Sequence, residues 1–208
     1  EDRLAFSALI SLDNNGHIID YKFAKTLIRS RVKGVYAEIN RILRGEITDE
    51  LQEKYAEVMA TFPAMTELAD VLYKNKEIRG APQLESVESK LIISNEDICV
   101  DVVPRTRGRS EEIIEDFMLV ANECAARFGI ENNLPFVYRI HEYPSDEKIQ
   151  GLKEGLVKLN IPYNTNGNLK PQDLKEIMEK AKDSSKFMVV NNLVLRSMSK
   201  ARYSPEPV

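Results

Sequence analysis

Two polar residues stand at unusual positions in the stretch Ser110 to Phe128, which has the strongest helical pattern of the chain. At about 100° per residue, Glu115 and Asn122 fall on one line among apolar positions, whereas Asp116 falls on the polar strip. We therefore expect Glu115 and Asn122 to point into the protein. A buried carboxylate needs an ion pair, hydrogen bonds or a metal ion. Glu115 is then either a functional acid or half of an interior ion pair, and Asn122 could equally bind a backbone group.

A tyrosine, an arginine and a histidine offer further contacts. Tyr36 shares a helical face with apolar residues, which favours a core tyrosine, with a ligand contact as the alternative. In extended geometry, Arg139 and His141 lie on one face of the stretch 134–144. Arg139 is then a candidate interior partner of Glu115, and in that case both residues are structural.

Few side chains suit metal binding or a familiar catalytic motif. The sequence has no Gly-rich phosphate loop, nucleophile elbow or His-Glu-x-x-His pair. Asp97 and Asp101 share a predicted strand face, which is a weak basis for a carboxylate–metal site. The cysteines and histidines are too few and too scattered for a zinc site, and we expect the cysteines to be reduced core thiols; these residues are Cys99, Cys124, His17 and His141.

The charges are unevenly distributed along the chain. The formal net charge of −4 gives no general attraction to nucleic acid. Residues 22–44, however, contain seven basic side chains, Arg31 among them, against one acid. A second cluster, formed by Arg105, Arg107 and Arg109, precedes the central helix. Both clusters are compatible with phosphate contacts, although a solvated surface is the commoner meaning of such a pattern.

The remaining pattern predicts the elements that position these residues. Residues 3–12 are apolar on both faces, which predicts a covered sheet, and Pro63 is expected to kink or split its helix. The alternation of hairpins and helices predicts an α+β fold, with a mixed or antiparallel sheet packed with several helices. We expect one hairpin formed by residues 3–12 and 18–23, a second formed by residues 90–94 and 98–103, and a strand within 134–144. We expect helices over residues 35–43, 48–77, 110–128 and 184–201, and two further helices that begin at residues 145 and 171.

Composition limits the class of protein. A chain of 208 residues with 43% hydrophobic content can form one large domain or two small ones. It contains no run of 18 apolar residues, and its first residues, EDRLAFS, lack the features of a signal peptide. We expect a cytoplasmic protein without membrane contact.

Four collinear stretches carry a family resemblance. They are residues 2–7 (DRLAFS), 113–122 (IIEDFMLVAN), 138–144 (YRIHEYP) and 195–198 (LRSM), with supporting matches at 30–36 and 79–80. Together they closely resemble the catalytic RNB domain of the RNase II and RNase R family, and most nearly its bacterial RNase R members. The resemblance covers essentially the whole chain.

The resemblance implies a processive, Mg²⁺-dependent 3′-to-5′ exoribonuclease that hydrolyses single-stranded RNA to nucleoside 5′-monophosphates. It implies that residues 1–208 are the central part of a single RNB domain. The family's magnesium-binding aspartate cluster would precede Glu1, and its phosphate-gripping arginine segment would follow Val208. We therefore expect the chain to be inactive by itself, with the magnesium ligands mostly outside it.

The resemblance also implies roles for single residues. Glu115 matches the first acid of the family's Glu-Glu pair and is the catalytic candidate, while Tyr36 matches a tyrosine placed against a base at the 3′ end. Leu91 stands where the family has a second stacking aromatic. The implied RNA contacts are Tyr36, Arg31, Asn122, Arg139, His141 and Arg196.

The alternative function is a non-catalytic RNA-binding or scaffolding module with the same fold. Strands that are apolar on both faces and lack neighbours could also support self-association of the chain.

Overall fold

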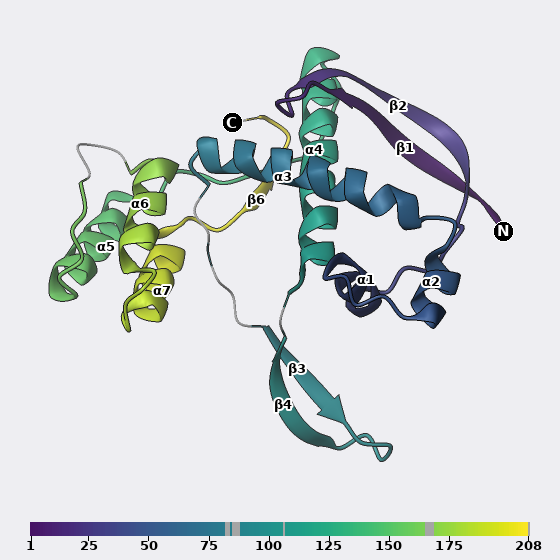
Figure 1. Ribbon diagram of the computed structural model, residues 1–208. Helices are drawn as coiled ribbons and strands as arrows, with labels where there is room; N and C mark the ends of the chain where they lie inside the picture. Colours follow the sequence, from purple (N-terminus) through teal and green to yellow (C-terminus); the bar gives the residue numbers. More distant parts are fainter. Residues whose placement is uncertain (82–83, 85–87, 106, 165–168, 208) are drawn as a thin grey trace. The chain divides into compact units, whose positions relative to one another are not determined.

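The structure is a computed structural model that describes residues 1–81, 84, 88–105, 107–164 and 169–207 (Figure 1). The chain divides into two compact units. The first unit comprises residues 1–75 and 87–125, and the second comprises residues 76–86 and 126–208. Both units contain helices and antiparallel strand pairs, so the predicted α+β class is confirmed. Within the described residues, no helix is long and apolar enough to cross a membrane.

The first strand pair is the hairpin predicted near the start of the chain. Strand β1 (Asp2–Leu12) pairs antiparallel with β2 (Ile18–Arg29), which is longer than expected. The connecting turn requires Gly16, whose φ is 77°. A Cβ at Gly16 would also lie 2.7 Å from Nδ2 of Asn75. This position therefore excludes a side chain for two reasons, backbone conformation and space.

The prediction of a covered sheet is wrong for this hairpin. Leu4 is 90% exposed, and Phe6 and Leu27 are also exposed. Among the described residues, the two strands pair only with each other, which leaves these side chains in contact with solvent. An apolar pattern on both faces indicates side chains that favour burial, but it does not identify the element that buries them.

Three helices and a short 3₁₀ turn follow in the first unit. They are α1 (Tyr36–Leu43), α2 (Asp49–Tyr55), the turn η1 (Met59–Thr61) and α3 (Phe62–Ile78). The predicted split of the 48–77 tract is confirmed, although the break lies before Pro63. Pro63 sits in the first turn of α3, where its missing N–H group is not needed for a helical hydrogen bond.

Tyr55 fixes the start of α1 from the core of this unit. Its side chain is buried with Ile42, Leu51 and Phe62. The Tyr55 hydroxyl accepts a hydrogen bond from the Val35 amide at 3.1 Å and donates one to Oε2 of Glu38 at 2.5 Å. Burial and the bond to Glu38 raise the pKa of Tyr55.

Glu38 also binds a lysine. Its Oε2 lies 2.6 Å from Nζ of Lys54. The hydrogen bonds from Lys54 and Tyr55 hold the pKa of Glu38 below its ordinary value. Helix α1 begins at Tyr36, the residue after Val35, so the bonds of Tyr55 to Val35 and Glu38 help to position the backbone of Tyr36.

The second predicted hairpin is also confirmed. Strand β3 (Glu88–Ile93) pairs antiparallel with β4 (Cys99–Arg105). Asp97 has a φ of 58° and lies in the turn, so the prediction that it shares a strand face with Asp101 is wrong. Cys99 is exposed on β4, contrary to the expected core thiol, whereas Cys124 is buried, and neither cysteine forms a disulfide.

The long helix predicted from residue 110 is α4 (Arg109–Glu131). It is three residues longer at its C-terminal end than the pattern indicates. Its part within the first unit carries Glu115, Asp116 and Asn122.

The second unit contains a helical cluster and a short strand pair. Its helices are α5 (Asp146–Lys158), α6 (Pro171–Ala181) and α7 (Phe187–Ser197). The predicted starts at Ser145 and Pro171 are confirmed, because Ser145 caps α5 and Pro171 is the first residue of α6. The three helices pack around a common apolar core.

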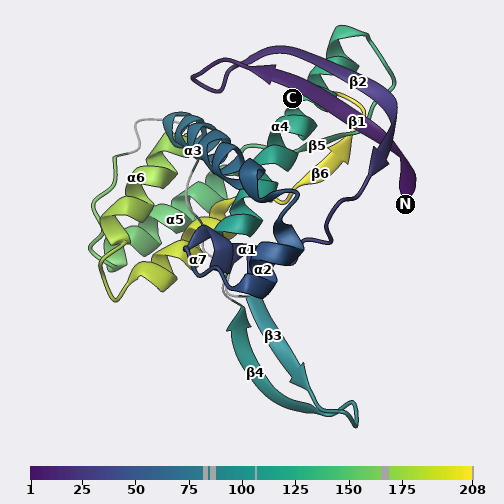
Figure 2. The same cartoon turned by 45° about the vertical axis from the view of Figure 1, so that its right-hand side comes forward.

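The strand pair of this unit is only partly predicted. Strand β5 (Tyr138–Ile140) is shorter than the stretch 134–144, and its partner is β6 (Arg202–Ser204) (Figure 2). The expected helix over 184–201 instead ends at Ser197. A three-residue strand whose partner lies about sixty residues away leaves too little local pattern to detect.

Candidate functional site

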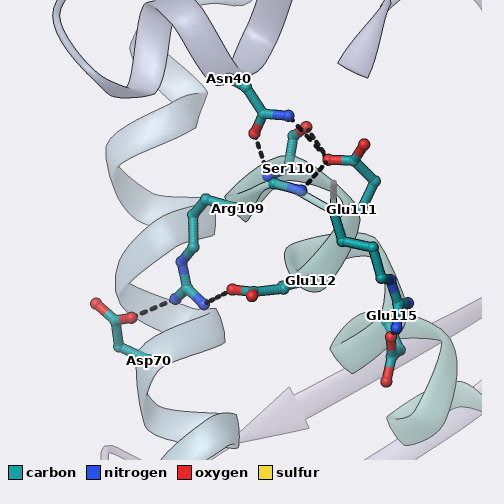
Figure 3. Close-up of polar contacts among 9 residues, drawn as sticks. Asn40, Asp70, Arg109, Ser110, Glu111, Glu112 and Glu115 are labelled. Carbon is teal, nitrogen blue, oxygen red and sulfur yellow. Dashed lines mark hydrogen bonds and ion pairs between the residues drawn. The ribbon is translucent and has the colours of Figure 1, made fainter. Parts of the chain in front are cut away.

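The N-terminus of α4 is tied to α1 by one asparagine. Oδ1 of Asn40 accepts a hydrogen bond from the Ser110 amide at 2.8 Å, and Nδ2 of Asn40 donates to Oε2 of Glu111 at 2.9 Å (Figure 3). The Gly108 amide also donates to Oε2 of Glu111, at 3.1 Å. A Cβ at Gly108 would lie 2.1 Å from Nδ2 of Asn40, so glycine is required for this close approach.

These bonds also fix the backbone of Tyr36. The Ser110 hydroxyl lies 3.2 Å from the Tyr36 carbonyl oxygen and 3.1 Å from Oε2 of Glu111. Burial acts to raise the pKa of Glu111, but hydrogen bonds from Asn40, Ser110 and the local backbone outweigh it and lower the pKa. Glu111 is therefore a charged acid with a fixed position.

Arg109 connects the same helix to α3. Its guanidinium forms an ion pair with Asp70, and its Nη1 lies 3.1 Å from Oε2 of Glu112 (Figure 3). The Arg109 side chain is 28% exposed, less than the side chains of Asp70 and Glu112. Of the predicted cluster Arg105, Arg107 and Arg109, this last member therefore has a structural role.

A groove of about 380 Å³ lies between α1 and this part of α4. Its walls combine an aromatic ring, cations, acids, an amide and apolar groups. They include Tyr36, Arg105, Arg107, Glu115, Met118 and Asn122. The structure thus brings Tyr36 of α1 to the same groove as Glu115 and Asn122 of α4, although Tyr36 is far from these two residues in the sequence.

A second, mostly apolar hollow of about 260 Å³ adjoins this groove. Tyr36 and Ile114 line both cavities. Tyr36 is 44% exposed, so the interpretation of Tyr36 as a core tyrosine is wrong. Its ring has apolar support and remains accessible from the groove.

The prediction that Glu115 and Asn122 point into the protein is wrong. The Glu115 side chain is 41% exposed and Asn122 is exposed, whereas Asp116 is the buried acid at 4%. The buried line of α4 follows Ile113, Asp116 and Cys124. The sequence pattern misleads because apolar residues beside Glu115 form a groove wall, and their side chains are not in the core.

Glu115 does pair with an arginine, but with Arg107. The two side chains form an ion pair, and both are about half exposed, so this is not the interior pair that was expected. Arg139, the candidate partner named from the sequence, belongs to the second unit. Arg107 lies in the segment before α4, eight residues from Glu115, and helical spacing cannot detect such a pair.

The other predicted contact residues lie outside this groove. Arg31 belongs to the same unit and lies 3.8 Å from Oε2 of Glu57. Leu91 is exposed on β3. The remaining three, Arg139, His141 and Arg196, are exposed residues of the second unit. Nδ1 of His141 lies 3.4 Å from the Ser199 carbonyl oxygen.

The acids of the groove do not by themselves fit a magnesium site. Mg²⁺ requires several oxygen ligands in near-octahedral geometry. Oε2 of Glu111 already accepts hydrogen bonds from Asn40 and Gly108, and Oε2 of Glu115 faces Arg107. Across the part of the chain that the structure describes, there is no group of three or more metal-binding side chains close enough to hold an ion.

Comparison with known proteins decides the family. Residues 1–208 match the family model described as "RNB domain". The chain belongs to the RNB domain family. This RNB chain is 34% identical to Ribonuclease R of Thermotoga maritima over 205 residues, which cover 98% of the chain and 28% of that protein. It is 31% identical to Ribonuclease R 1 of Lactococcus lactis, with 98% of the chain and 25% of that protein covered.

A solved structure confirms the RNB fold. The RNB chain superposes on Mycoplasma genitalium RNase R in complex with ribose-methylated single-stranded RNA with a TM-score of 0.90 and 26% sequence identity. The match covers 100% of this chain and 32% of that one. The RNB chain therefore spans between a quarter and a third of the length of these proteins, and it is homologous to ribonuclease R.

Proposed function

We propose that this chain is the central part of a single RNB nuclease domain. The full-length protein that contains it is then a processive, Mg²⁺-dependent 3′-to-5′ exoribonuclease, which hydrolyses single-stranded RNA to nucleoside 5′-monophosphates in the cytoplasm. Family membership and the similarity to ribonuclease R proteins over the whole chain support this proposal.

The groove beside α4 carries the proposal. Proteins that bind single-stranded nucleic acid combine cationic grooves with aromatic rings on which bases stack. This groove offers the exposed ring of Tyr36 beside Arg105 and Arg107. Glu115 and Asn122, on the same wall, supply acceptors and donors for hydrogen bonds to a nucleotide.

Each of these residues has a role in the proposal. Tyr36 stacks on a base near the 3′ end, the arginines neutralise phosphates, and Asn122 contacts a base or sugar edge. Glu115 acts at the reacting nucleotide as a hydrogen-bond acceptor that orients it. The other proposed RNA contacts, outside the groove, are Arg31, Arg139, His141 and Arg196.

Magnesium chemistry belongs to another part of the full-length protein in this proposal. The described acids do not assemble a site of several oxygen ligands. We assign most of the magnesium ligands to residues outside this chain and expect no hydrolysis by the chain alone.

The test is the substitution Glu115→Ala in the full-length protein. Because Glu115 orients the reacting nucleotide, we expect kcat to fall by roughly 10²-fold or more, with a much smaller change in RNA affinity. Glu112→Ala, three residues earlier on the same exposed helix face, is the matched control for helix stability and surface charge. Intact cleavage by Glu115→Ala would show that Glu115 is only structural.

The same measurement decides the alternative function. A full-length protein that binds RNA but shows no hydrolysis with Mg²⁺, even without substitutions, is a non-catalytic binding or scaffolding module. In that case Glu115→Ala would alter binding alone.

A further inference from the structure

The ion pair between Arg107 and Glu115 lies inside the groove proposed for RNA. Both residues line it, and their side chains are 53% and 41% exposed. The acid assigned to the reacting nucleotide is therefore already paired with a cation of the same chain.

This pair differs from the other charged contacts at the start of α4. Arg109 contacts two acids, Asp70 and Glu112, which connect two helices. Glu111 is surrounded by donors from Asn40 and the backbone. Removing either Arg109 or Glu111 from its partners would break several contacts at once, whereas separating Arg107 from Glu115 breaks one exposed ion pair.

A phosphate can replace Glu115 at Arg107 at little cost. Exposed ion pairs contribute a factor of about five at most to an equilibrium constant. A guanidinium matches two phosphate oxygens as well as it matches a carboxylate, and bidentate contacts of this kind are the stronger ones. A strand stacked on Tyr36 would bring its phosphates to the wall that carries Arg107.

We propose that Arg107 exchanges Glu115 for an RNA phosphate when a strand enters the groove, so that the Glu115 carboxylate becomes available only with RNA in place. Arg107 is then a positioning residue that couples phosphate binding to release of the acid. This inference rests on the proposed function, because it requires the groove to bind RNA.

The test is a double-mutant cycle of RNA binding by the full-length protein. Dissociation constants for a fluorescent RNA oligonucleotide are measured in EDTA, to prevent hydrolysis, over a range of salt concentrations. We expect Arg107→Gln to reduce the slope of log affinity against log salt by about 0.7, the value for one contact to a single strand. Arg107→Lys should keep the slope because it keeps the charge, and it shows that the loss in Arg107→Gln is not a folding defect.

The second arm removes the competing acid. Glu115→Gln should tighten RNA binding by up to about fivefold when Arg107 is present, because the phosphate no longer competes with a carboxylate. The same substitution should have no effect in the Arg107→Gln background. This difference separates exchange at Arg107 from general repulsion between an acid and RNA.

Two outcomes would overturn the exchange, and a third would overturn the groove. Equal tightening by Glu115→Gln in both backgrounds, or an unchanged salt slope in Arg107→Gln, would refute exchange while leaving RNA binding intact. Absence of salt-dependent binding by the unsubstituted protein would refute the groove as an RNA site, and with it the exchange.

Discussion

The contact between Gly108 and Asn40 predicts a strongly non-additive pair of substitutions. Asn40→Ala removes the hydrogen bond that caps the Ser110 amide and the one that Glu111 accepts. A side chain cap contributes about 1 kcal/mol, and a hydrogen bond to a charged group in a half-buried position contributes about 1.5 kcal/mol. We therefore expect Asn40→Ala to lower the free energy of unfolding by about 2.5 kcal/mol.

Gly108→Ala should have nearly the same cost for a different reason. Its Cβ would lie 2.1 Å from Nδ2 and 2.6 Å from Oδ1 of Asn40, so the amide must move and lose both bonds. Two further effects of alanine on the free energy of unfolding have similar size and opposite sign. Alanine has less conformational freedom than glycine in the unfolded chain, which favours folding, but it is a poorer helix N-cap residue, which disfavours folding. The expected cost is again about 2.5 kcal/mol.

The double variant tests this reasoning. If both substitutions remove the same two bonds, Asn40→Ala combined with Gly108→Ala should also cost about 2.5 kcal/mol, about half the sum of the single effects. Urea unfolding followed by circular dichroism gives the three free energies. Hydrogen exchange of the Ser110, Glu111 and Glu112 amides shows whether the loss is local to the start of α4. If the losses in free energy of unfolding of the two single variants add up in the double variant, the idea that Gly108 is needed to make room for the Asn40 side chain is refuted.

Three further predictions concern the groove and its supports. Tyr36→Ala in the full-length protein should weaken RNA binding by about 5- to 150-fold, the range for one lost base stack, whereas Tyr36→Phe keeps the ring and should bind almost normally in the same titration. The lowered pKa of Glu38 means that its contribution to stability is complete above its ordinary value of 4.5 and is lost as pH falls through the lower folded-state pKa. Thermal unfolding from pH 7 to 3 should therefore show a smaller acid-induced loss in Glu38→Gln, and an unchanged loss would contradict this assignment. The 208-residue chain alone should bind single-stranded RNA with an affinity that falls as salt rises and should not cleave it with Mg²⁺; cleavage would show that this chain contains the metal site.

Much of the fold could be predicted from local pattern. The hairpin β1–β2 follows from apolar strands around Asp13-Asn14-Asn15-Gly16, and the helix starts at Ser145 and Pro171 follow from capping chemistry. Pro63 marked a real break, but the boundary lay earlier because proline is tolerated in a first helical turn. Strand β6 could not be predicted, since it exists only through its pairing with β5.

The candidate site, like the fold, could be predicted from the sequence only in part. The sequence by itself determined the family, through four collinear motifs, and it selected Tyr36 and Glu115 as residues of interest. Only the tertiary structure decided which acid of α4 is buried, because a helical wheel ranks faces by composition and cannot show whether an apolar face packs in a core or lines a groove. It also decided that Arg107 is the partner of Glu115. That pair forms where a loop turns back beside a helix, and such proximity depends on the path of the chain, which residue spacing does not record.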